Sequence, residues 1–151
     1  MLPLDTKTGN RLRSWTGSAK LAGSLDEVQL TERLIAFDTS TPEGLRPALE
    51  FVEGWLRGSG ATVERRSFAD RDCVIARVGN GSPRIVFHGH LDVVPGHADQ
   101  FCPDHREGRL YGRGTYDMKG ALAAMMLAIS DLAVSLVGAT IDLVIVPDEE
   151  R

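Results

Sequence analysis

The run ATIDLVIVP, residues 139–147, constrains the fold more than any other part of the sequence. It is almost wholly apolar, which is typical of a strand that is buried on both faces of a sheet. An apolar helical segment, residues 118–136, stands directly before it. A buried strand that follows a helix indicates a layered α/β arrangement.

Helices and strands alternate along the rest of the chain. A Ser at position 24 with Glu27 three residues later has the capping-box pattern, which predicts that a helix opens there. Apolar spacing and turn residues predict the other elements. The expected elements are helices over 28–37, 45–57 and 118–136, and strands over 61–67, 72–78, 84–89 and 139–147.

Composition excludes several classes of protein. The chain has 151 residues, 42% hydrophobic and 25% charged, which suits a globular domain with one core. Its net charge of −4, with scattered Lys and Arg, argues against a nucleic-acid or membrane partner. Cys73 and Cys102 form no CxxC pair and no secretory signal is visible, so we expect a cytoplasmic protein. Residues 1–23 are polar and aperiodic, and a loose N-terminal extension is predicted there.

Candidate functional side chains stand where strands end or helices begin. His90 and Asp92 follow the strand over 84–89, Asp117 opens the last helix, and Glu149 and Glu150 follow the strand over 139–147. Residues at the carboxyl ends of strands in an α/β sheet converge on one point. An imidazole with several carboxylates is a ligand set that suits zinc, and it also suits manganese or cobalt.

Each group has a chemical role that it is able to fill. The carboxylate of Asp92 can accept the second ring N–H of His90 and so fix its tautomer. Asp117 has two oxygens and can bridge two metals. In an extended segment Glu149 and Glu150 point to opposite sides, so one can ligate while the other moves protons. A carboxylate beside a metal-bound water is what amide hydrolysis needs.

Three motifs carry a resemblance to a known family. GHLDVVP, GRLYGRGTYDMKGALAA and VPDEE, in this order, resemble the dinuclear zinc amidohydrolases that include acetylornithine deacetylase, succinyl-diaminopimelate desuccinylase, aminoacylase and carboxypeptidase G. The resemblance implies that His90 binds one zinc, Asp117 bridges both, and Glu150 binds the other. It also implies that Asp92 orients His90 and that Glu149 is the general base.

The resemblance implies further properties of the fold and the reaction. We expect a mixed, mainly parallel sheet sandwiched by helices, as in zinc exopeptidases, and a cis peptide between Asp117 and Met118. The substrates would be N-acyl amino acids or small peptides, and the complete protein would be a homodimer.

Family members continue beyond the DEE motif with further metal ligands and a dimerising domain, whereas this sequence stops one residue after Glu150. Residues 24–151 are therefore expected to be the N-terminal portion of a catalytic domain, with an incomplete fold and no activity as a fragment. The alternative is a noncatalytic remnant with a partial metal site.

Overall fold

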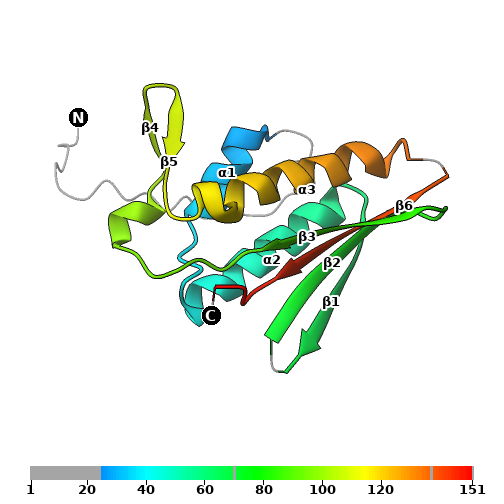
Figure 1. The fold of residues 1–151 in the computed structure, drawn as a ribbon, viewed down its shortest axis with the longest axis horizontal. Coiled ribbons are helices and arrows are strands. Elements are labelled where there is room, and N and C mark those ends of the chain that lie inside the picture. Colours follow the sequence, from blue (N-terminus) through cyan, green and yellow to red (C-terminus); the bar gives the residue numbers. More distant parts are fainter. Residues whose placement is uncertain (1–24, 70, 137, 151) are drawn as a thin grey trace, which may run out of the picture.

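The computed structural model describes residues 25–69, 71–136 and 138–150, and it shows a twisted sheet with helices packed along it (Figure 1). The predicted extension over residues 1–23 lies outside these residues. The helices are α1 (Glu27–Ile35), α2 (Pro42–Gly58) and α3 (Gly120–Ala133), with the short helical turns η1 (Ala98–Phe101) and η2 (Thr115–Lys119). The strands are β1 (Thr62–Phe68), β2 (Arg71–Gly79), β3 (Arg84–His90), β4 (Asp104–Arg106), β5 (Arg109–Tyr111) and β6 (Thr140–Val146). None of these helices has the length and apolar character that a membrane span requires.

Capping residues decide where the first helices begin. The Asp26 carboxylate accepts a hydrogen bond from the backbone N–H of Gln29 (2.8 Å), and Asp26 N donates to Gln29 Oε1 (3.1 Å). The predicted box of Ser24 and Glu27 was therefore wrong, because Asp caps a helix as well as Ser does and Gln29 completes the box one step later. α2 begins at Pro42, whose fixed φ suits the first turn of a helix.

The larger sheet has the strand order β1-β2-β6-β3. The mixed α/β fold class is confirmed, but the expectation of mainly parallel pairing is not met among the described strands. β1 pairs with β2, and β2 with β6, in antiparallel fashion, and β3 with β6 is the parallel pair. Only two residues separate β1 from β2, which is enough to join antiparallel strands, whereas the crossover through α3 brings β6 alongside β3 in the same direction. β4 and β5 form a separate antiparallel ribbon.

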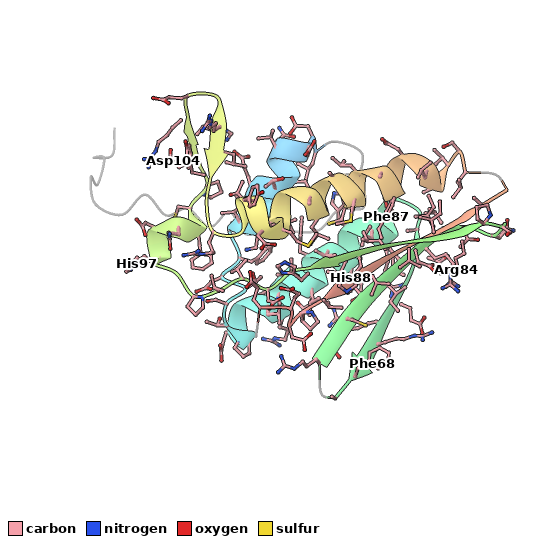
Figure 2. All side chains as sticks on the ribbon, in the orientation of Figure 1. Phe68, Arg84, Phe87, His88, His97 and Asp104 are labelled. Atoms are coloured by element: carbon pink, nitrogen blue, oxygen red, sulfur yellow. The ribbon has the colours of Figure 1, made fainter. Side chains whose placement is uncertain are left out.

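The helices cover one face of this sheet. Ile141, Leu143 and Ile145 of β6 are buried in one apolar cluster with residues of α2 and α3. On the opposite face Val86 is 56% exposed, and His88 on the same strand is exposed as well (Figure 2). The expected sandwich of helices is therefore not found in the described residues. The burial of β6 on both faces is confirmed in large part, because each of its residues is buried or half-buried. All the described helices pack together on the same side, which leaves the other face without a helical layer.

A buried carboxylate joins three strands at the start of β6. Asp142 is 1% exposed, and it lies between Arg77 of β2 and Arg84 of β3. The Arg77 Nε to Asp142 Oδ1 distance is 2.6 Å, and Arg84 donates to Asp142 Oδ2. Burial alone would raise the pKa of Asp142, but the hydrogen bonds from the two guanidinium groups outweigh it and hold the pKa below its ordinary value.

Candidate metal centre

The parallel pairing of β3 with β6 places the carboxyl ends of these two strands, and the candidate segments that follow them, side by side. His90, the last residue of β3, stands opposite Val146, the last residue of β6. Leu91 N donates to Val146 O (2.9 Å), which carries the pairing one residue further. The chain after β3 and the chain after β6 therefore leave the sheet side by side. The strand register thus brings together the residues of the GHLDVVP and VPDEE motifs.

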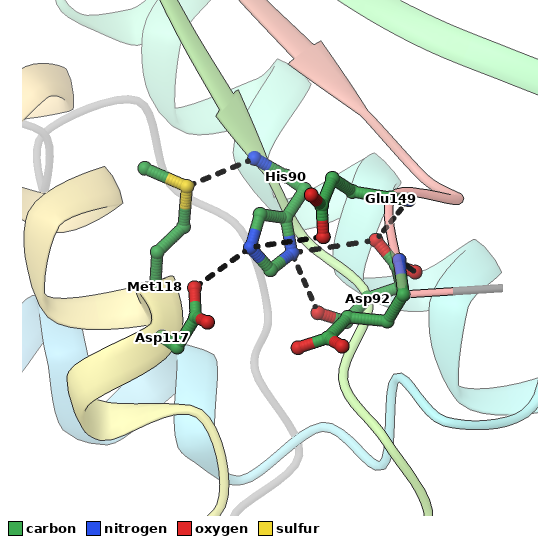
Figure 3. A network of polar contacts seen from close by, with 6 residues as sticks. His90, Asp92, Asp117, Met118 and Glu149 are labelled. Atoms are coloured by element: carbon green, nitrogen blue, oxygen red, sulfur yellow. Dashed lines mark hydrogen bonds and ion pairs between the residues drawn. The ribbon is translucent and has the colours of Figure 1, made fainter.

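His90 is the buried centre of the site (Figure 3). Its Nε2 lies 3.0 Å from Asp117 Oδ1, and its Nδ1 lies 3.0 Å from the backbone oxygen of Asp92. Burial by itself would lower the pKa of His90, but the contacts with Asp117 and with Asp92 together raise it above its ordinary value. The ring is therefore fixed on both edges.

Asp92 binds the backbone of the segment that follows β6, a contact that the sequence did not predict. It is fully buried, and its two carboxylate oxygens accept hydrogen bonds from Glu149 N (3.1 Å) and Glu150 N (2.9 Å). The predicted contact from the carboxylate to His90 Nδ1 is longer, at 3.5 Å, than the contact from the backbone oxygen. Asp92 thus holds the DEE segment in place as well as the imidazole. Nothing in the sequence could reveal hydrogen bonds to backbone amides that lie 57 and 58 residues further along the chain.

Asp117 reaches His90 from the start of the α3 segment. Its side chain is 67% exposed, and the peptide between Asp117 and Met118 is cis, as the resemblance implies. The preceding turn depends on Gly114, which has φ +80°. A Cβ there would lie 2.6 Å from a methyl carbon of Val93, so only glycine allows the two loops to approach this closely.

Lys119 is a buried cation beneath this turn that the sequence did not single out. Its Nζ donates to the backbone oxygen of Phe37 (2.9 Å), which ties the turn before α3 to the segment that follows α1. Burial lowers the pKa of Lys119 to about 8. The sequence offered no signal for this contact, because a Lys in a helical pattern is most often a solvated residue.

The structure brings all the predicted site residues together. His90, Glu149 and Glu150 each offer a ligand atom, and these atoms lie within 4.8 Å of one another. The predicted ligands were His90, Asp117 and Glu150, so this group differs from the prediction by having Glu149 instead of Asp117. The distance from His90 Nε2 is 3.0 Å to Asp117 Oδ1 and 4.0 Å to Glu149 Oε2, so both carboxylates flank the same ring nitrogen. Beside them lies a cavity of about 390 Å³ that Asp117 and Glu150 line.

Charge at the site is unbalanced. Four carboxylates meet there, and across residues 25–69, 71–136 and 138–150 no Lys or Arg forms an ion pair with any of them. The four are Asp92, Asp117, Glu149 and Glu150. The imidazole of His90 lies within ion-pair distance of Asp92, Asp117 and Glu149. Carboxylates that gather without cationic partners, around a ring nitrogen, have the donor chemistry that divalent metals bind.

Solved structures share this arrangement of helices and strands. Human carnosine dipeptidase 1 superposes with a TM-score of 0.71 at 22% identity, covering 80% of this chain and 31% of that one. A Zn-dependent exopeptidase from Parabacteroides distasonis superposes with a TM-score of 0.60 at 16% identity, covering 79% of this chain and 44% of that one. The fold is therefore that of the zinc exopeptidases.

Sequence comparison finds similarity to one peptidase family. Residues 86–151 match peptidase family M20/M25/M40. The succinyl-diaminopimelate desuccinylase of Parvibaculum lavamentivorans is 39% identical over 141 residues, which cover 85% of this chain and 35% of that protein. The chain spans about a third of the length of the curated relatives it matches. The resemblance predicted from the three motifs is confirmed, and the chain is related to this family.

Proposed function

We propose that the protein is a metal-dependent hydrolase of the amide bond in N-acyl amino acids or small peptides, with N-succinyl amino acids as the preferred class. One observation carries the proposal. The imidazole of His90 and the carboxylates of Asp117, Glu149 and Glu150 converge without a basic partner among the described residues. The relatives named as succinyl-diaminopimelate desuccinylases support the choice of acyl group.

The donor set fits zinc. His90, Asp117 and Glu150 would hold the metal, and the uncompensated negative charge favours a dication over a neutral ligand. Cobalt or manganese would suit the same nitrogen and oxygen donors. When bound, the metal would lower the pKa of a coordinated water and polarise the scissile carbonyl. Two zinc ions per complete site, and a homodimer, stay predictions from the family resemblance.

The chain's own residues would orient the site and move the proton. The contact of His90 Nδ1 with the Asp92 oxygen leaves Nε2 directed at the carboxylates. Asp92 fixes the backbone of Glu149, whose side chain is 57% exposed and so open to water and substrate. Glu149 would take a proton from the attacking water and return it to the departing amine.

Turnover assays on the full-length protein test this proposal. Zinc-loaded protein would be given N-succinyl-diaminopimelate, N-acetylornithine or N-acetylmethionine, and release of free amine would be followed. We expect turnover that is fastest for the succinyl compound, that a chelator abolishes and that added zinc restores. Metal binding without turnover of any of the three would favour the noncatalytic alternative and contradict the proposal.

A further inference from the structure

Two loops carry the site residues, and one side chain joins them. The HLD loop (residues 90–97) follows β3, and the GRG loop (residues 112–117) leads into α3. Gln100 Oε1 accepts a hydrogen bond from His97 N at the end of the HLD loop (3.0 Å) and another from Arg113 Nη2 in the GRG loop (2.8 Å). We propose that Gln100 is a positioning residue of the metal centre, which sets the spacing between the two loops. This inference rests on the proposed function of the site.

Backbone hydrogen bonds also connect both loops to Gln100, and the side chain of Gln100 adds a second attachment for each loop. Arg113 N donates to Gln100 O (2.6 Å), and Gln100 N donates to His97 O (3.0 Å). The amide oxygen adds the second point of attachment, and two points together prevent the GRG loop from pivoting. The distance between His90 in the HLD loop and Asp117 in the GRG loop is thereby held constant.

Arg113 depends on this amide oxygen. Its Nε is buried and has no hydrogen-bond partner among the described residues. The guanidinium group is therefore held by the hydrogen bond from Nη2 to Gln100 Oε1. Gly96 makes room for the pair. A Cβ at Gly96 would lie 2.5 Å from Gln100 Oε1 and 2.8 Å from Arg113 Nε. The HLD loop is thus shaped to seat both groups.

The braced loops form the walls of the cavity beside the site. Val93 and Val94 of the HLD loop line this cavity together with Arg113 and Asp117 of the GRG loop. Any change in loop spacing would therefore move Asp117 relative to His90. Metal affinity is sensitive to such displacement, because outer groups that orient ligands typically change affinity by about 10- to 100-fold.

The chain provides a matched control. Gln29 caps α1 in the way that Gln100 caps η1, with its Oε1 accepting from the backbone N–H of the capping residue (3.1 Å). Within the described part of the chain, Gln29 forms its hydrogen bonds with Asp26 and none with either loop of the site. Gln29→Leu therefore removes the same capping bond as Gln100→Leu, without the link to Arg113.

Cobalt titration of the full-length protein tests the inference, with the visible absorption spectrum and the unfolding midpoint of the metal-free protein as further readouts. We expect Gln100→Leu to weaken cobalt binding by about tenfold and to alter the spectrum. Gln100→Glu should restore both, because a carboxylate oxygen accepts the same two bonds. Gln29→Leu should leave both unchanged at a similar unfolding midpoint.

Gly96→Ala provides a second route to the same displacement, and we expect the same loss of cobalt affinity from it. Cobalt binding that is unchanged in Gln100→Leu and Gly96→Ala, or weakened equally in Gln29→Leu, would overturn this inference alone. Wild-type protein that takes up no cobalt would overturn the proposed function with it.

Discussion

Two aspartates are almost completely buried at opposite ends of the β3 and β6 pair, and their charges are balanced in different ways. Asp142 is 1% exposed and lies between Arg77 and Arg84. Asp92 is 0% exposed and accepts two backbone N–H groups, with His90 as its nearest titratable partner. The first aspartate has full positive charges beside it, and the second has dipoles and an imidazole.

This difference shows at which end of the strand pair the described residues balance the buried negative charge. A buried charge persists in a protein where it is paired or where it contributes to binding a metal. The Asp142 end satisfies that condition with its own arginines. The Asp92 end adds the carboxylates of Asp117, Glu149 and Glu150 and no Lys or Arg pair among the described residues. We therefore expect the two ends to respond differently to charge removal, to metal and to pH.

The largest expected difference is in turnover. Glu149→Gln in the full-length protein should lower turnover by about 10²- to 10⁴-fold, because the amide keeps the shape of the side chain but cannot take a proton. Its zinc content should stay close to normal, while Glu150→Gln should lose zinc. Asp142→Asn, the matched loss of a carboxylate at the far end, should leave turnover unchanged. Zinc loss in Glu149→Gln but not in Glu150→Gln would exchange the two roles.

The next difference is in zinc affinity. Asp92→Asn turns an NH₂ group toward one of the two backbone N–H groups that the carboxylate holds, so the DEE segment should shift. We expect zinc affinity to fall by about 10- to 100-fold. Competition with a chelating indicator would measure it, with Asp142→Asn as the control of equal charge. Equal affinities in the two variants would show that Asp92 does not organise the site.

The smallest difference is in stability and its pH dependence. Asp142→Asn should lower the free energy of unfolding by about 1.5 kcal/mol at pH 7, because hydrogen bonds to a charged group are lost. The folded-state pKa of Asp142 is held below its ordinary 3.8. The stabilisation is thus fully present above about pH 4 and is lost as pH falls through the lowered folded value. Urea unfolding of both proteins from pH 7 to pH 2.5 would reveal a constant gap if this assignment were wrong.

Local patterns predicted the elements and the place of the site. Periodicity located α2 and α3, and the rule for strand ends located His90 and the DEE segment. The antiparallel pairing of β2 with β6 was not predictable, because it depends on which strand comes to lie beside another. The roles of Lys119 and Gln100 were missed for a related reason. Each contacts the backbone or side chain of a distant loop, and a polar residue in a helix or turn gives no sign of such a partner.

The central claim is that the carboxyl ends of β3 and β6 form a zinc site. Crystals of the full-length protein grown with zinc would test it most directly, through an anomalous difference map recorded above the zinc absorption edge. The account predicts a peak about 2.0–2.1 Å from His90 Nε2, with carboxylate oxygens of Asp117, Glu149 or Glu150 at about 2.0–2.2 Å. Zinc peaks that lie only elsewhere on the protein, or none at saturating zinc, would contradict it.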